Sequence, residues 1–402
     1  MSLSNLALNG GEMLRSSSMP ARNAFGIEER KAVMEVINFY SEKELDPSYD
    51  GHFEREYSKN ISTYMGGGYS EILCSGTSAI YVALKSLELP NNSHVLVSSV
   101  TDAGSISPII LSGLRPILVD TRHDNFNIGL EQISERVTVK TSAILIVHFG
   151  GQPVKDINEI VLWARERELK VVEDCSQATG SEINSKKVGS FGDIAAWSTG
   201  SRKIQIAGGN GGVVYTKNKD LYKKVVAYGD RGKPKLDKNY VERDPSTYML
   251  PGLNLKSDEI SSSIGISSLR RLDKVRAKRI KFVEKINKLI NEKSNCCLPY
   301  ENIITSSPFF HPVIIKKDAL KVDKITFANA LIAEGIPLNP HYMFLCADWK
   351  WLKPYLVDDF DPPNARRLRD KSFNLFLNEN YGNEEVDDII NAIIKVEFCF
   401  LK

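Results

Sequence analysis

The sequence predicts an α/β protein whose large domain has a mainly parallel sheet, followed by a smaller α+β domain. Between Cys74 and Thr216, short apolar runs alternate with segments of helical period. This alternation is typical of βαβ units, which bury a parallel sheet under helices on both faces. After Pro308 the pattern changes to a strand and separate helices. The chain has 402 residues, enough for two to three domains of about 150 residues.

The large domain is predicted to alternate strand and helix. We expect strands at residues 94–100, 116–119, 143–149 and 170–174, and helices at residues 79–87, 105–111, 130–137 and 157–168. Two more strands flank a glycine-rich stretch, one ending at Ser198 and one ending near Thr216. Residues 257–293 have helical period, and the basic run from Arg270 to Arg279 within them is interpreted as a solvated face.

The predicted organisation has four parts. They are a loose N-terminal arm at residues 1–25, the large domain at 26–256, a linking helix at 257–295 and the small domain at 296–402. In the small domain we expect a strand at 309–315 and helices at 325–333 and 384–396.

Composition narrows the class of protein. Hydrophobic residues make up 42% and charged residues 25%, which predicts a folded, soluble protein, and the net charge of +2 is too small to indicate a nucleic-acid or membrane partner. The six cysteines have no CxxC spacing, which favours reduced thiols, and the histidines have no metal-ligand spacing, so no metal is expected. Neither a membrane span nor a secretory pattern is recognised, which predicts a cytoplasmic protein.

The first motif with chemical meaning is CSGTSAI. Gly76, Thr77 and Ser78 follow a strand and open a helix, where free backbone N–H groups and the helix dipole suit a phosphate. An ordinary helix N-cap is the alternative interpretation.

The second motif is VVEDCSQATG. Asp174 ends a buried strand, at the sheet edge where α/β proteins bind ligands, and Gln177 follows closely. A carboxylate there suits a protonated ring nitrogen, although Asp174 is also a candidate N-cap. Glu173 is expected to face the opposite side and to be structural.

The third motif lies between two strands. Ser198 ends the first strand, Lys203 follows, and glycines at 208, 209, 211 and 212 precede the second strand. Lys203 is a candidate Schiff-base lysine, with a solvated loop lysine as the alternative, since a reactive amine needs a lowered pKa. The glycine cluster lacks the Walker pattern of a P-loop.

The order of the three motifs is more informative than any one of them. A phosphate cup, a ring-nitrogen carboxylate and a lysine are the three parts that a pyridoxal 5'-phosphate (PLP) enzyme needs. Their order along the chain predicts a PLP site.

The motifs resemble the DegT/DnrJ/EryC1/StrS family of sugar aminotransferases, which have the aspartate aminotransferase fold (fold type I). The resemblance rests on SGTSAIYVALKSL, VVEDCSQATGSE, VGSFGDIAAWS, GGNGGVVYT and LPGLNLKSDE. It implies that Lys203 and Asp174 are catalytic. It implies cofactor-binding roles for Gly76, Thr77, Ser78, Asp174, Gln177, Ser198, Lys203 and Asn254, with Asn254 reaching the phosphate of a neighbouring subunit.

Three features depart from the family pattern: Asp102, Lys256, and Thr199-Gly200-Ser201-Arg202, which stand before Lys203 where the family often has an aromatic residue or His followed by Pro. Asp102 stands where the family usually has an aromatic residue stacked on the cofactor ring, and Lys256 replaces a common Arg after Asn254, a change expected to affect the sugar pocket or its phosphate contacts. His341-Tyr342 matches the family's HY pair and is interpreted as a surface loop pair, with a place in the lining of the sugar cleft as the alternative.

The resemblance implies an aminotransferase that moves an amino group from glutamate to a nucleotide-linked keto sugar, for amino-sugar and cell-surface polysaccharide biosynthesis. It also implies a homodimer with shared active sites. Two alternatives stay open: a PLP-dependent sugar dehydratase of the same family, in which His replaces the lysine, and a non-catalytic PLP-binding regulatory protein.

Overall fold

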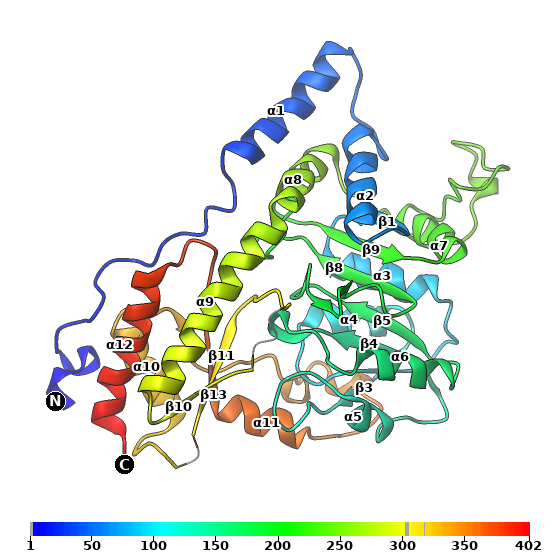
Figure 1. Ribbon diagram of the computed structural model, residues 1–402. Helices are drawn as coiled ribbons and strands as arrows, with labels where there is room; N and C mark the ends of the chain where they lie inside the picture. Colours follow the sequence, from blue (N-terminus) through cyan, green and yellow to red (C-terminus); the bar gives the residue numbers. More distant parts are fainter. Residues whose placement is uncertain (1–2, 302–304, 317) are drawn as a thin grey trace.

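A computed structural model describes residues 3–301, 305–316 and 318–402. Two main sheets organise these residues, and the long helix α9 (Leu272–Lys293) connects the parts of the chain that form them (Figure 1). The fold is α/β with a mainly parallel central sheet, as the sequence predicts.

The larger sheet has the order β1-β9-β8-β5-β4-β2-β3. Strand β9 is antiparallel to β1 and β8, and the remaining neighbours are parallel. The strands are β1 (Tyr69–Leu73), β2 (His94–Ser98), β3 (Arg115–Val119), β4 (Thr141–Val147), β5 (Lys170–Asp174), β8 (Ile194–Ser198) and β9 (Gly212–Thr216).

Helices bury both faces of this sheet, which explains why its strands read as continuous apolar runs. Along β4, Ala143 and Leu145 belong to one core while Ile144 and Ile146 belong to the other. The first core is covered by α3 (Gly76–Ser86), α4 (Ala103–Leu111) and α7 (Lys219–Gly229). The opposite face is covered by α5 (Leu130–Ser134) and α6 (Ile157–Arg165), and at its β1 end by α2 (His52–Tyr64) and α8 (Glu259–Arg270).

The predicted linking helix is two helices, α8 and α9, interrupted at Arg271. The N–H of Arg271 bonds to Ser268 O at 3.3 Å, a tighter three-residue step that ends α8. The interpretation of the basic run as a solvated face is wrong for Arg276 and Arg279, which are 8% and 2% exposed. Both guanidiniums instead bind backbone carbonyls and acidic side chains inside the protein.

The C-terminal part forms an antiparallel sheet in the order β10-β11-β13-β12. Its elements are β10 (Cys297–Pro299), β11 (His311–Ile315), α10 (Lys324–Ala333), β12 (Leu338–Asn339), α11 (Pro363–Asp370), β13 (Ser372–Leu375) and α12 (Asn383–Phe400). Together with α9, these elements except α11 enclose a separate hydrophobic core. The buried residues of α11, Ala365 and Leu368, belong to another cluster.

The described part of the N-terminal arm, residues 3–25, packs against the small domain, in contrast to the prediction of a loose arm. Leu6 is fully buried in the core of the small sheet, and the N–H groups of Ala7 and Leu14 donate to the Glu334 carboxylate at 3.0 Å. Arg15 pairs with Asp388 on α12 at 2.5 Å. One buried apolar side chain and these polar contacts order a segment whose composition alone suggests flexibility. The arm leads into α1 (Ile27–Glu42), at the periphery of the molecule (Figure 1).

None of the described helices is long and apolar enough to cross a membrane. All six cysteines lie within the described residues and carry free thiols.

Candidate active site

The predicted site residues gather where β5 and β8 end and α3 begins. Asp174 is the last residue of β5 and Ser198 the last of β8, and these strands are parallel neighbours. Gly76 opens α3 directly against Ser198, because a Cβ added to Gly76 would lie 2.5 Å from the Ser198 Cβ. The fold therefore brings three separate motifs to one edge of the sheet.

The start of α3 has the properties of an anion site. Its N-cap is Ser75, whose Oγ accepts from the N–H of Ser78 at 3.0 Å. The N–H groups of Gly76 and Thr77 have no acceptor within the helix, as in the first turn of any helix. Together with the Ser198 hydroxyl, they form a cup suited to a phosphate. The N-cap interpretation thus applies to Ser75 rather than to the three predicted residues.

Asp174 is held in a fixed orientation and is only 3% exposed. Its Oδ1 accepts from the N–H of Ser176 at 2.9 Å, and its Oδ2 accepts from the hydroxyl of Ser105 on α4 at 2.6 Å. Ser105 was missed in the sequence, where no motif marks it. The neighbouring Glu173 is fully buried on the opposite side and accepts from three backbone N–H groups, as expected for a structural residue.

Lys203 lies in a hydrogen-bonded loop between β8 and β9. Its N–H donates to Gly200 O at 2.9 Å, and the loop is closed by the bond from Thr199 N to Gly211 O at 2.8 Å. The Lys203 Nζ lies 4.9 Å from the ring centre of Phe309. Burial lowers the pKa of Lys203, and the charges of Asp174 and Asp102 partly oppose this shift. A half-buried amine with a lowered pKa is not the solvated loop lysine of the alternative interpretation.

Tyr342 belongs to the site, so its interpretation as a surface residue is wrong. Its hydroxyl pairs with the side chain of Gln177, whose Oε1 also accepts from the N–H of Gly150 at 2.7 Å. The Tyr342 ring packs edge-on against Phe149 at 5.5 Å, and burial raises the pKa of Tyr342. The family's HY pair was the signal in the sequence.

Asp102 caps the start of α4, where its Oδ1 accepts from the N–H of Gly104 at 2.8 Å. It is exposed, and its charge acts on the Lys203 amine. Phe309, which the sequence did not single out, is the aromatic side chain in contact with that amine.

Asn254 stands apart from the other predicted residues. Its side chain is exposed and donates to the Tyr49 hydroxyl at 3.0 Å. Among the contacts of the described residues, none joins Asn254 to Gly76, Ser198 or Lys203.

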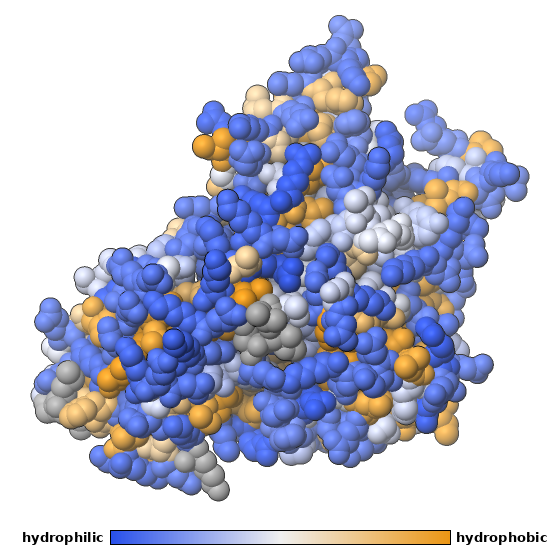
Figure 2. Space-filling view, viewed as in Figure 1, coloured by the Kyte–Doolittle hydropathy of each residue, from blue (hydrophilic) through white to orange (hydrophobic). Residues whose placement is uncertain are grey.

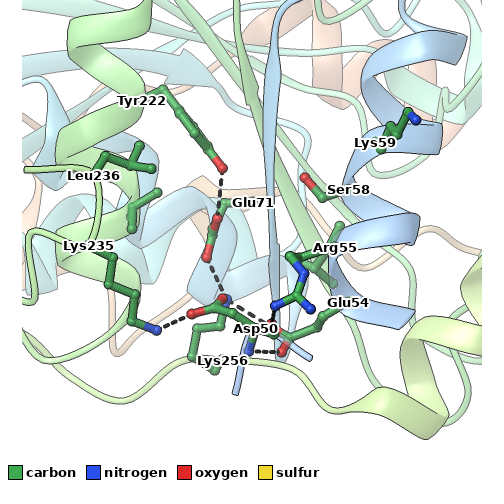
Figure 3. A pocket seen from close by; sticks show the side chains of 12 residues that line it. Asp50, Glu54, Arg55, Ser58, Lys59, Glu71, Tyr222, Lys235, Leu236 and Lys256 are labelled. Atoms are coloured by element: carbon green, nitrogen blue, oxygen red, sulfur yellow. Dashed lines mark hydrogen bonds and ion pairs between the residues drawn. The ribbon is translucent and has the colours of Figure 1, made fainter. Parts of the chain in front are cut away.

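Lys256 pairs with buried acidic side chains, contacts that the expectation for this position did not include. Its side chain is 3% exposed, and its Nζ pairs with Asp50 at 2.5 Å, Glu54 at 3.1 Å and Glu71 at 2.6 Å. These groups line a cavity of about 380 Å³ between β1, the start of α2 and the loop that carries Lys235 (Figure 3). Lysine here neutralises buried carboxylates.

The described residues also contain one group with the composition of a metal site: His148, Glu173 and Cys175. The His148 Nε2 pairs with Glu173 at 3.2 Å, and its Nδ1 accepts from the N–H of Val154 at 3.0 Å. These bonds give both ring nitrogens a structural role.

The residues present fit PLP. The α3 cup with Ser198 suits its phosphate, the oriented Asp174 carboxylate suits its ring nitrogen, and the Lys203 amine suits its aldehyde. The fold and the site are those of the PLP-dependent transferase class.

Residues 30–394 match the DegT/DnrJ/EryC1/StrS aminotransferase family, and the chain belongs to this family. The family is PLP-dependent, and PLP is the cofactor that the sequence predicted.

Known relatives include three informative proteins. The uncharacterised protein MJ1066 of Methanocaldococcus jannaschii is 27% identical and covers 96% of this chain and 99% of its own. The GDP-perosamine synthase of Escherichia coli O157:H7 is 30% identical over 61% of this chain and 65% of its own. The dTDP-3-amino-3,6-dideoxy-alpha-D-galactopyranose transaminase of Aneurinibacillus thermoaerophilus is 25% identical over 84% and 88%.

Among solved structures, an aminotransferase from Psychrobacter cryohalolentis superposes with a TM-score of 0.84 at 26% identity, over 94% of this chain and 98% of that chain. The E. coli GDP-4-keto-6-deoxy-D-mannose-3-dehydratase with bound hydrated PLP has a TM-score of 0.83 at 22% identity, over 95% and 100%, and shares the fold.

Proposed function

We propose that this protein is a PLP-dependent aminotransferase that moves an amino group from glutamate to a nucleotide-linked keto sugar, as a step in amino-sugar and cell-surface polysaccharide biosynthesis. The observation that carries the proposal is the half-buried Lys203 amine. Burial lowers its pKa, and the nearby charge of Asp174 partly opposes this shift. The activities of two relatives, the GDP-perosamine synthase and the dTDP-amino-sugar transaminase, support the substrate class.

In the proposed reaction, bound PLP supplies an aldehyde and an electron-accepting ring. Asp174, oriented by Ser105 and Ser176, holds the proton on the ring nitrogen. The lowered pKa of Lys203 favours the neutral form of its amine, which would act as the nucleophile toward the aldehyde and then as the base that carries the substrate proton. The first turn of α3 and Ser198 bind the phosphate.

The dehydratase alternative is disfavoured by Lys203 itself. In the family that the motifs resemble, the dehydratases have His at the position where the aminotransferases have the lysine. This chain has the lysine, and its amine contacts the Phe309 ring.

The proposal includes a homodimer in which Asn254 serves the neighbouring subunit. Asn254 is exposed in the isolated chain, as such a residue must be. Large apolar side chains are also exposed on and beside α1 and on the loop before Asn254: Phe25, Ile27, Met34, Ile37, Leu236, Val241, Met249 and Leu253. Most of the surface that Figure 2 shows is hydrophilic, so these exposed apolar side chains are candidates for the interface.

The test is the half-reaction with glutamate alone. Purified protein loaded with PLP should change its visible absorbance to that of pyridoxamine phosphate, and Lys203→Ala should abolish the change. Lys186→Ala is the matched control, because burial also lowers the pKa of Lys186 and its amine also lies over an aromatic ring, Phe191, at 4.1 Å.

The second half-reaction separates the enzyme classes. Addition of keto-sugar nucleotides should restore the PLP absorbance of the enzyme. Mass spectrometry should then detect the amino-sugar products. A product that has instead lost water would assign the dehydratase, and a protein unresponsive to both substrates would favour the regulatory alternative. Full turnover by Lys203→Ala would contradict the proposal.

A further inference from the structure

The N-terminal arm reaches the loop that carries Lys203. The Arg22 guanidinium donates to the backbone carbonyl of Lys203 itself, to Ile204 O at 3.2 Å and to Ser201 O at 3.2 Å. One side chain from the start of the chain therefore binds three carbonyls around the predicted reactive lysine.

Arg22 is itself held in place by the C-terminal part. Its Nε donates to Glu379 Oε1 at 3.4 Å, and the Asn380 side chain donates to the carbonyls of Ala21 and Arg22 at 2.8 and 3.2 Å. Asn378 donates to Pro20 O at 2.9 Å. These contacts fix the backbone of the arm on both sides of the guanidinium.

The other oxygen of Glu379 binds a second arginine. Arg279 on α9 donates to Glu379 Oε2 from Nη2 at 2.7 Å and from Nε at 3.2 Å. Burial would raise the pKa of Glu379, but the Arg279 charge keeps it below its usual value, so the carboxylate is ionised. A buried guanidinium that is 2% exposed requires such a partner.

Arg279 in turn holds the segment that faces Lys203. Its Nη1 donates to Pro308 O at 3.2 Å, next to Phe309, whose ring lies 4.9 Å from the Lys203 Nζ. The N–H groups of Ser307 and Phe309 bond to the carbonyls of Gly151 and Gly150 at 2.9 and 3.0 Å. The Phe309 segment is therefore fixed to the large sheet domain as well as to α9.

We propose that Arg22, Glu379 and Arg279 form a clamp that positions Lys203, with Arg22 holding its backbone and Arg279 holding the Phe309 segment against its amine. Glu379 joins the two halves, so the N-terminal arm and the small domain both determine where the reactive amine lies. All three are positioning residues. This inference rests on the proposed function only in taking Lys203 as the reactive amine.

The test compares Arg22→Ala and Glu379→Gln with Arg15→Ala, which removes an arm contact to α12 that does not involve the Lys203 loop. Hydrogen–deuterium exchange of the cofactor-free proteins is the first readout. Arg22→Ala should increase exchange of amides 199–207 on the order of tenfold, the effect of losing hydrogen bonds from a charged donor, while Arg15→Ala should leave them unchanged.

The second readout is the loaded protein. Arg22→Ala should shift the pH midpoint of the cofactor's visible absorbance and lower kcat while KM for glutamate stays constant, and Arg22→Lys should restore part of the effect. Unchanged exchange of residues 199–207 in Arg22→Ala, or equal exchange in Arg15→Ala, would overturn the clamp. If Glu379→Gln fails to fold, Arg22→Ala and Arg22→Lys still test the clamp.

Failure of the clamp and failure of the proposed function are distinguishable. Borohydride reduction and peptide mapping report whether the cofactor attaches to Lys203, whatever the clamp does. Exchange of the loop in the cofactor-free protein reports the clamp, whatever reaction the enzyme catalyses.

Discussion

At the residue scale, neighbouring side chains acquire different chemistry from the faces on which they lie. Glu173 and Asp174 are consecutive on β5 and point to opposite sides of the sheet. Glu173 is fully buried and accepts hydrogen bonds from backbone N–H groups, whereas Asp174 faces α4 and the Lys203 amine. Alternation along a strand allowed this assignment from the sequence alone.

Glu54 is a residue whose ionisation only the tertiary structure reveals. It shares Lys256 with Asp50 and Glu71 in the cavity of Figure 3. Burial raises the pKa of Glu54 from 4.5 to about 7, although the Lys256 charge opposes the shift. Because the folded pKa is the higher one, this group's stabilising contribution is full below about pH 4.5 and is lost as the pH rises through 7.

We therefore expect Glu54→Gln, which mimics the protonated form, to gain stability relative to the wild type as the pH rises. Urea unfolding at pH 5 and pH 8 measures the change, with an upper limit of about 3 kcal/mol since each pKa unit corresponds to about 1.4 kcal/mol. Glu56→Gln, at a half-buried position on the same helix, is the control. A stability difference that is the same at both pH values would contradict the assignment.

At the scale of elements, the site depends on how closely α3 approaches β8. Glycine is required at this contact, since a Cβ on Gly76 would meet Ser198 and a Cβ on Gly212 would lie 2.0 Å from Ser75 O. The phosphate cup is thus a product of helix–strand packing.

We expect Gly76→Ala to weaken PLP binding by about tenfold or more, because overpacking that separates α3 from β8 costs about 1–3 kcal/mol. Absorbance titration of the cofactor-free protein with PLP measures the affinity, and thermal unfolding measures the stability. Gly209→Ala in the nearby glycine cluster is the control, since a Cβ there meets nothing within 4 Å. Equal PLP affinity in both variants would show that the contact at Gly76 is unimportant for the cup.

Two predicted elements agree closely with the structure in their boundaries. The strand at 170–174 agrees with β5 at both ends, and the helix at 325–333 differs from α10 by one residue. The predicted single helix over 257–293 failed at Arg271, because its apolar period continues through a local change in hydrogen bonding.

At the scale of the whole molecule, the N-terminal arm packs against the C-terminal small domain. Leu6 lies in the core formed with α10 and α12, and Arg22 contacts both Glu379 and the Lys203 loop. The arm therefore connects the small domain with the Lys203 loop of the large domain.

The proposed shared site predicts complementation between subunits. Lys203→Ala and Asn254→Ala homodimers should each be impaired, because each lacks one part of every site. Unfolding and refolding them together should restore about a quarter of the wild-type sites, since random pairing gives hybrid dimers with one complete site. No gain in activity on mixing would place Asn254 outside the partner's site.

The sequence by itself determined the α/β class, the family and the three motifs with their order, because these depend on local periodicity and on residue types at fixed spacing. Tertiary structure decided what sequence spacing cannot encode: the burial of Lys256, Arg276 and Arg279, the ordered arm, and the contacts of Ser105, Phe309 and Tyr342 with the site. These features arise from contacts between segments tens to hundreds of residues apart, and each side chain's environment is set by the partner it meets there.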